Sequence, residues 1–203
     1  GKIYCSEPTK EFATVFLADS CHLMQNEAEF LGQPSLYDQV DVDNTIPLIE
    51  TVTYHQKFSP FEGVEVEFLD AGHILGSAIV KITSQDKTIV FSGDLGNPPV
   101  PILKTTEEID SADYVIMEST YGDRTHEPVE KRKEQLEQII EASIAEKGTI
   151  LMPSFAMERT QEILYELNNL VENKKIPFIP VYLDSPLAIK ATEIYAKFPE
   201  YFN

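Results

Sequence analysis

Asp70-Ala71-Gly72-His73-Ile74-Leu75-Gly76-Ser77-Ala78 is the stretch of the chain that decides the fold. It follows the run Val64-Glu65-Val66-Glu67-Phe68, whose strict alternation of apolar and acidic residues is typical of a half-buried strand. His73 therefore stands just past the end of a strand. Glycines on both sides allow the backbone to turn there and to approach its neighbours closely. The pattern predicts a histidine held on a tight loop at one edge of a sheet.

A second strand end follows along the chain. Short strands are predicted at Ala78–Ile82 and Thr88–Phe91, and the residues Ser84-Gln85-Asp86-Lys87 between them are typical of a hairpin turn. The strand Thr88–Phe91 is followed by Ser92-Gly93-Asp94-Leu95-Gly96. An aspartate between glycines therefore lies just after this strand, in the same way that His73 lies just after the strand that begins at Val64.

A third acid, Glu118, ends the compact apolar run Tyr114–Met117, which we expect to be a fully buried strand. If the three strand ends share one edge of a sheet, His73, Asp94 and Glu118 converge. Imidazole nitrogen and carboxylate oxygen are ligands that zinc accepts. A hydrogen-bonded histidine and an aspartate in an ordinary turn would give the same pattern, so spacing alone leaves both interpretations open.

The rest of the chain predicts an α/β protein in two parts, residues 1–120 and 121–203, because mixed β structure gives way to alternating helices and strands near residue 121. The further expected elements are a strand at Ile3–Cys5, a helix at Glu7–Glu29 capped by Ser6, a short helix begun by Asp43 or Asn44 and reaching Val52, a helix at Val129–Glu146, a strand at Thr149–Met152, a helix with Ile163, Leu167 and Leu170 on its apolar face, a strand at Phe178–Leu183 and a last helix from Pro186.

Composition limits the function classes. The 203 residues are 42% hydrophobic and 25% charged, which is typical of a globular protein, and no apolar run approaches the roughly 20 residues that span a bilayer. We expect no membrane partner and a cytoplasmic location. The net charge of −18 argues against a broad surface that follows nucleic-acid phosphates, although not against a local site for one phosphate. Cys5 and Cys21 are expected to be reduced thiols.

Five sequence blocks follow one another along the chain. They are Ala71-Gly72-His73-Ile74-Leu75-Gly76-Ser77-Ala78, Phe91-Ser92-Gly93-Asp94, Glu118-Ser119-Thr120-Tyr121-Gly122, Pro153-Ser154-Phe155-Ala156-Met157-Glu158-Arg159-Thr160-Gln161-Glu162 and Asp184-Ser185-Pro186-Leu187-Ala188. In this order they resemble motifs of the metallo-β-lactamase superfamily, and of its β-CASP nucleases in particular. The resemblance implies part of an αββα sandwich followed by part of an α/β β-CASP cap domain, and a metal-dependent ribonuclease activity.

The resemblance also implies residue roles. His73 would bind one metal ion, Asp94 would bridge two zinc ions, and Glu118 would orient a catalytic group beside them. Arg159 and Ser185 stand at predicted helix starts, where a guanidinium or hydroxyl can contact a substrate phosphate. A surface ion pair for Arg159 and an N-cap role for Ser185 are the alternatives. The expected substrate is RNA, cleaved at phosphodiester bonds.

The family's main metal-binding motif, His-x-His-x-Asp-His, does not occur in the sequence, whose histidines are His22, His55, His73 and His126. We therefore expect an incomplete zinc site, in a truncated piece of a larger enzyme that is inactive by itself. Two alternatives remain open: a non-catalytic β-CASP scaffold subunit of an RNA-processing complex, and a small-molecule hydrolase of the same superfamily. Self-association into a homo-oligomer is also open.

Overall fold

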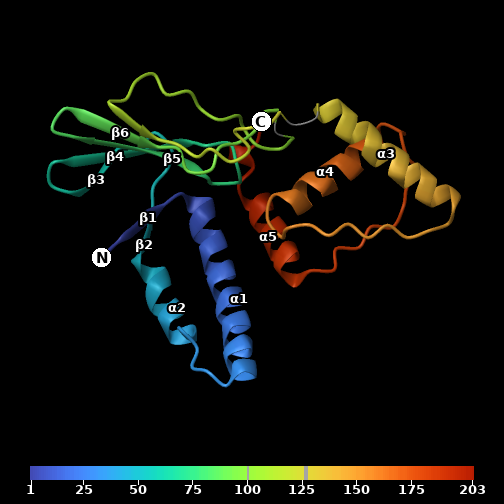
Figure 1. Ribbon diagram of the computed structural model, residues 1–203, viewed down its shortest axis with the longest axis horizontal. Helices are drawn as coiled ribbons and strands as arrows, with labels where there is room; N and C mark the ends of the chain where they lie inside the picture. The colour runs from blue at the N-terminus through green and yellow to red at the C-terminus, as the bar shows by residue number, and fades with distance from the viewer. Residues whose placement is uncertain (100, 126–127) are drawn as a thin grey trace.

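The computed structural model describes residues 1–99, 101–125 and 128–203, so the histidine at position 126 lies outside the described residues. Helices and strands are mixed along the chain, which confirms the predicted α/β class (Figure 1). The strands are β1 (Ile3–Cys5), β2 (Ile49–Thr51), β3 (Phe58–Phe61), β4 (Val64–Asp70), β5 (Ala78–Ser84), β6 (Lys87–Phe91) and β7 (Tyr114–Ile116). The helices are α1 (Glu7–Leu31), α2 (Gln39–Thr45), α3 (Val129–Ala145), α4 (Arg159–Glu172) and α5 (Pro186–Lys197), with short 3-10 turns at Ile46–Leu48 and Pro199–Tyr201.

One sheet carries the three strand ends singled out in the sequence. Within the described residues its order is β3-β4-β5-β6-β7, antiparallel from β3 to β6 and parallel between β6 and β7. The carboxyl ends of β4, β6 and β7 therefore lie at the same edge. The predicted hairpin joins β5 to β6 through Gln85 and Asp86, both with positive φ, as a tight two-residue turn requires.

Helix α1 begins where the sequence predicts. The Ser6 hydroxyl accepts a hydrogen bond from the Thr9 N–H, and Gly32 in the left-handed conformation ends the helix after Leu31, two residues beyond the predicted end. The Ser6 hydroxyl also donates to the Gly76 carbonyl at 2.7 Å. This bond attaches the start of α1 to the loop that carries His73.

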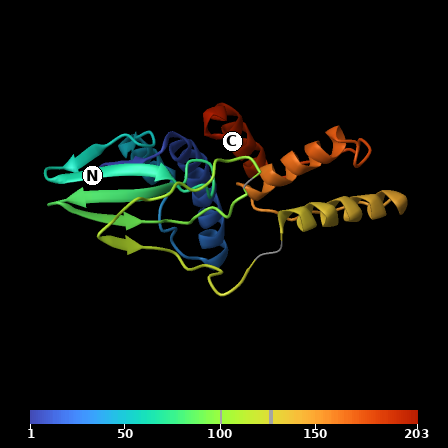
Figure 2. The same ribbon diagram turned by 90° about the horizontal axis from the view of Figure 1, so that it is seen from above.

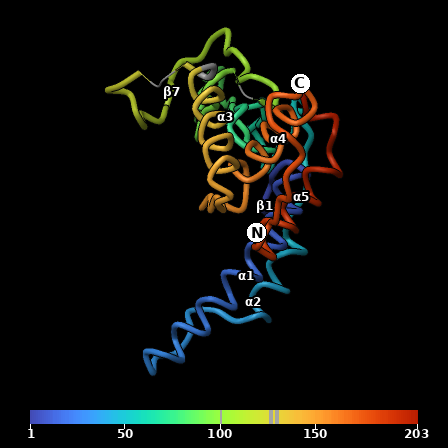
Figure 3. The backbone as a smooth tube through the Cα atoms, turned by 90° about the vertical axis from the view of Figure 1, so that its right-hand side faces the viewer, coloured from blue at the N-terminus to red at the C-terminus, as the bar shows by residue number. Residues whose placement is uncertain are grey.

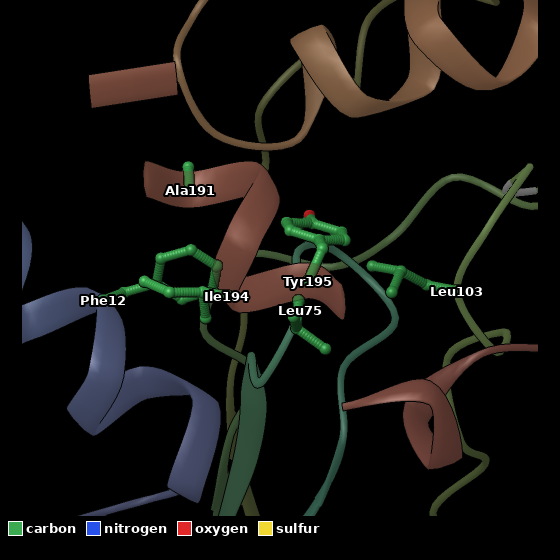
Figure 4. Packing of buried hydrophobic residues seen from close by; sticks show 6 residues of the cluster. All are labelled: Phe12, Leu75, Leu103, Ala191, Ile194 and Tyr195. Carbon is green, nitrogen blue, oxygen red and sulfur yellow. The ribbon is translucent and has the colours of Figure 1, made fainter. Parts of the chain in front are cut away.

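A buried apolar cluster joins the two parts of the chain. It brings α1 and α5 against the loop after β4, so the first residues of the chain pack against nearly the last. Figure 1 shows α5 between the sheet and the paired helices α3 and α4, and Figure 4 shows the buried side chains of the cluster from close by. The buried members are Phe12, Leu75, Leu103, Ala191, Ile194 and Tyr195.

Helices α3 and α4 extend together away from the sheet (Figure 2), packed through Ile140 and Leu167. Helices α1 and α2 run away from it in another direction (Figure 3). None of the helices in the described part of the chain combines the length and apolarity needed to cross a bilayer.

The short second helix was predicted at the wrong place. Asp38, not Asp43 or Asn44, is its N-cap, and a reciprocal capping box between Asp38 and Asp41 fixes its start. Ile49–Thr51, expected to be helical, instead forms β2 parallel to β1. Pro47 lies in the 3-10 turn between α2 and β2. Because proline has no backbone N–H to donate, it favours the end of a helix at this point.

The run Tyr114–Met117 is not buried as predicted. The side chains of Tyr114, Val115 and Ile116 are 61%, 61% and 54% exposed. Strand β7 is the edge strand of the described sheet and pairs only with β6 there, which leaves its other side uncovered. An apolar strand is buried only where another element covers it. The sequence of the strand itself does not show whether such an element is present.

The two strands expected at 149–152 and 178–183 are extended segments without a ladder partner among the described residues. Ile150 and Ile179 pack against the α3–α4 cluster, as one face of a strand would. The opposite face carries strongly exposed apolar side chains. These are Leu151, Phe155, Phe178 and Tyr182, each 85–89% exposed.

Candidate active site

The His73 loop is built by its own hydrogen bonds. The Ser77 hydroxyl accepts from the backbone N–H groups of His73 (3.1 Å) and Ile74 (3.2 Å), and the Asp70 carboxylate accepts from the Gly72 N–H at 2.8 Å. Burial raises the pKa of Asp70, while the hydrogen bond from Gly72 opposes the shift. The loop therefore presents the imidazole just beyond the end of β4.

Two glycines bring the His73 and Asp94 loops into contact. The Gly96 N–H donates to the Ala71 carbonyl at 2.9 Å. A Cβ on Gly96 would lie 1.9 Å from the Gly72 carbonyl oxygen, and a Cβ on Gly72 would lie 2.5 Å from the Thr106 nitrogen. The backbones approach so closely that side chains larger than hydrogen cannot fit. His73 and Asp94 are thereby held at the same sheet edge.

Glu118 joins the Asp94 loop to β7. Its carboxylate accepts a hydrogen bond from the Leu95 N–H at 2.5 Å, and its own N–H donates to the Ser92 hydroxyl at 3.1 Å. The Leu95 hydrogen bond is the main cause that lowers the pKa of Glu118, followed by hydrogen bonding from Thr120; the charge of His73 contributes in the same direction. The three residues predicted to converge are thus brought together by the fold.

A cleft of about 1020 Å³ opens over these residues. His73, Asp94 and Glu118 line it from the sheet edge, and helices α3 and α4 contribute the opposite lining. The chain contains only three arginines, and all of them line this cleft: Arg124, Arg132 and Arg159. A strongly acidic chain thus places all its guanidinium groups in the cleft that holds the candidate metal ligands, with Arg132 on α3 and Arg159 on α4.

The two predicted phosphate contacts differ in position. Arg159 is the first residue of α4, lines the cleft and donates to Glu162 at 2.6 Å. Ser185 is absent from the residues that line the cleft, within the described part of the chain, and its hydroxyl accepts from the Ala188 N–H as the N-cap of α5. Substrate binding by Ser185 stays a prediction, and the structure gives its hydroxyl a capping role.

A metal ion needs more donor groups than the described residues bring together at this point. Zinc takes three or four protein ligands, whereas no group of three His, Cys, Asp or Glu side chains in the described residues could hold an ion. His73 and Asp94 supply two suitable donors, and Glu118 already accepts backbone hydrogen bonds. The described residues by themselves do not form a complete metal site.

Several cleft residues were missed in the sequence. No role is predicted from the sequence for Arg124, Arg132 and Glu158, which line the cleft, or for Tyr195, which packs in the central buried cluster. The rarity of arginine in the chain was the available signal for Arg124 and Arg132. Glu158 gave none, because its significance lies in a hydrogen bond to Tyr195, 37 positions away.

Comparison with known proteins agrees with the motifs. The model of the metallo-beta-lactamase superfamily domain matches residues 1–114, and that of the Beta-Casp domain matches residues 160–203. These ranges do not fix a boundary at residue 120, which stays a prediction.

The chain is 32% identical to a ribonuclease of Thermus thermophilus and 32% identical to an RNase J-like protein of Methanocaldococcus jannaschii, in both cases over its full length. It is 28% identical to an endoribonuclease of Kluyveromyces lactis, also over its full length. The matches cover 44%, 46% and 28% of those proteins, so the chain spans less than half the length of these relatives. On the family-model matches and the strand-end motifs together, the chain belongs to the metallo-β-lactamase superfamily, in the branch that carries a β-CASP domain.

Proposed function

We propose that the cleft cleaves phosphodiester bonds in RNA with the help of bound metal ions. The observation that carries the proposal is the cleft itself, which is lined both by His73, Asp94 and Glu118 and by all three arginines of the chain. Cleavage of a phosphodiester uses both metal ligands and arginines. The ligands hold metal ions that activate the reaction at phosphorus, and the guanidinium groups bind the charged phosphate oxygens. The names of the relatives, which are ribonucleases and endoribonucleases, support the same substrate.

The charge distribution supports recognition of phosphate inside the cleft rather than along the surface. With a net charge of −18, most of the surface repels a polyanion. Guanidinium groups in a cleft act at short range, where a bidentate contact to phosphate is favourable. We therefore expect a short stretch of RNA to be held at the cleft, with little contact elsewhere on this chain.

In this proposal the metal is zinc, with His73 and Asp94 as two of the ligands and the remaining ligands supplied from outside the described residues. Zinc, when bound, would provide an activated water and stabilise charge on the leaving oxygen. The chain's own contribution is to fix the two ligand loops against each other through Gly72 and Gly96 and to align the Asp94 loop through Glu118.

A matched pair of variants tests the proposal. Asp94→Asn removes a candidate bridging charge and should lower both bound zinc and RNA cleavage, the latter by about 100-fold or more, since even changes around metal ligands cost 10- to 100-fold. Asp86→Asn, in the distant β5–β6 turn, is the control and should change neither. The measurements are made on a form of the protein long enough to supply the remaining ligands, and they are elemental analysis and cleavage of a labelled single-stranded RNA.

The other outcomes separate the alternatives. Unchanged zinc content and rate in Asp94→Asn would refute the ligand assignment. A protein that binds RNA but neither holds metal nor cleaves would be the scaffold subunit. Hydrolysis of small esters without any cleavage of RNA would place it among the small-molecule hydrolases.

A further inference from the structure

One buried hydroxyl connects the two sides of the cleft. Tyr195 of α5 is 5% exposed and packs in the central cluster next to Leu75, two residues after His73 (Figure 4). Its hydroxyl donates to the Glu158 carboxylate at 2.7 Å. Burial is the main cause that raises the pKa of Tyr195, and a hydrogen bond from the Leu75 backbone to the same oxygen opposes that shift. The phenol thus contacts the His73 loop and the residue that precedes Arg159.

Glu158 holds an unusual backbone conformation at that point. Its φ of 69° and ψ of −71°, with the Arg159 N–H donating to the Met157 carbonyl at 3.0 Å, form a γ-turn of the strained, positive-φ type. A residue other than glycine keeps such a conformation only where its surroundings fix it, and strained backbone of this kind concentrates at functional sites. The carboxylate of Glu158 accepts the hydrogen bond from the Tyr195 hydroxyl, and α4 begins immediately afterwards with Arg159.

We propose that Glu158 and Tyr195 form a positioning pair, which holds Arg159 across the cleft from His73 and sets how strongly this arginine binds a substrate phosphate. The proposal rests on the proposed RNA-cleaving function, because it assigns a role in binding that substrate. Neither residue needs to touch RNA. Tyr195 acts through Glu158, and Glu158 acts through the conformation and the local charge at Arg159.

The charges around Glu158 give the pair a pH dependence. Burial raises the pKa of Glu158 to about 7; the charge of Glu162 acts in the same direction, and the hydrogen bond from Tyr195 and the charge of Arg159 oppose it. Arg159 and Glu162 face it from α4 and Tyr195 from α5, while His73 lines the same cleft from the sheet edge. Below pH 7 the Glu158 carboxyl is neutral, and only the Glu162 carboxylate offsets the positive charge of Arg159. Above pH 7 the Glu158 carboxylate is charged as well, and it competes with a substrate phosphate for Arg159.

Binding of a labelled single-stranded RNA in the presence of a chelator tests the pair without requiring catalysis. For the wild type, Kd should rise about threefold to fivefold between pH 6 and pH 8.5, the size expected for one partly exposed charge. Glu158→Gln should remove this pH dependence, because its side chain is neutral throughout. Tyr195→Phe should move the midpoint to higher pH, because the carboxylate loses a hydrogen-bond donor.

Two control variants carry the same chemical changes at exposed positions. Glu172→Gln at the end of α4 and Tyr182→Phe in the extended segment after it should keep the wild-type pH profile. A wild-type profile in Glu158→Gln, or a wild-type midpoint in Tyr195→Phe, would overturn the proposal. A loss of affinity that is equal at every pH would also contradict it, since a merely structural defect has that signature.

The proposed function can fail separately. If the wild type binds no RNA at any pH, the function is wrong, and the positioning pair is then judged by carbon-13 NMR titration of the Glu158 carboxyl group. A midpoint near 7 that rises in Tyr195→Phe would support the pair. A midpoint unaffected by the loss of the phenol hydroxyl would refute it, whatever the substrate.

Discussion

At the scale of single residues, the Glu118 carboxylate shows how one side chain can join two strand-end segments of the site. Its hydrogen bond from the Leu95 N–H fixes the loop of Asp94, and its negative charge faces His73. Because that hydrogen bond is the main cause that lowers the pKa of Glu118, the stability contributed by the charged carboxylate is fully present above the ordinary pKa of a glutamate. This contribution is lost as the pH falls through the lowered pKa.

Glu118→Gln should therefore slow RNA cleavage by about 10- to 100-fold, the range seen for residues that orient metal ligands, with little change in bound metal. The amide oxygen can still accept from the Leu95 N–H, so the loop keeps its position while the charge beside His73 disappears. Cleavage rate and metal content are measured on the same samples of the longer form that supplies the remaining ligands, with the exposed Glu62→Gln as control. A loss of metal in proportion to activity would mean that Glu118 is itself a ligand.

At the scale of the elements, the site depends on loops that are locked together by backbone contact. The loops after β4 and β6 meet where Gly96 lies against Gly72, and Ser6 at the start of α1 holds the same region from the other side. Such contacts leave no room for adjustment, since interiors are close-packed and transmit displacement.

Gly96→Ala should push the His73 and Asp94 loops apart. The added Cβ would overlap the Gly72 carbonyl, which we expect to cost about 1–3 kcal/mol of stability by overpacking and roughly 100-fold in rate through misplacement of the site. Gly32→Ala is the control, because Gly32 has a positive φ at the end of α1 but no atom within 4 Å of the added Cβ. Thermal unfolding and cleavage rate are compared, and a normal rate in Gly96→Ala would show that the loop contact does not matter for catalysis.

Elements with local signals could be predicted from the sequence. The Ser6 cap, the alternating residues of β4 and the turn at Gln85 and Asp86 each carry their own chemistry, and they appear where expected. The exposure of β7 could not be predicted, because burial depends on which element lies beside a strand. The pairing of Glu158 with Tyr195 was hidden for the same reason, since no local pattern reports a contact between distant positions.

At the scale of the whole molecule, the three arginines are not equivalent. Arg124 forms a two-point ion pair with Asp123, and Arg159 pairs with Glu162. Among the described residues, Arg132 has no ion-pair partner, although it lines the same cleft. A guanidinium without an ion-pair partner in the described part of the chain is the one that we expect to bind a phosphate most favourably, because the rest of the molecule is acidic.

Arg132→Gln should therefore weaken RNA binding and make it less sensitive to salt. Each phosphate contact on a single strand contributes about 0.7 to the slope of log K against log salt concentration, so the slope should become shallower by that amount. Lys190→Gln on α5, which removes a charge away from the cleft, should leave the slope unchanged. Equal changes in both variants would show that only net charge matters and that Arg132 makes no specific contact.

The uncovered edge strand has a consequence for how the protein behaves at high concentration. Beyond β7 the backbone amides and carbonyls have no partner within the described sheet, and the extended segments under α3 and α4 carry exposed Phe155, Phe178 and Tyr182. Unpaired, apolar strand edges are templates for pairing with other chains and for aggregation. The high negative charge opposes this by mutual repulsion, so screening by added salt should favour precipitation. Repulsion between the negatively charged molecules and pairing at the uncovered edge of β7 have opposite effects on aggregation. The balance between them sets the colloidal stability.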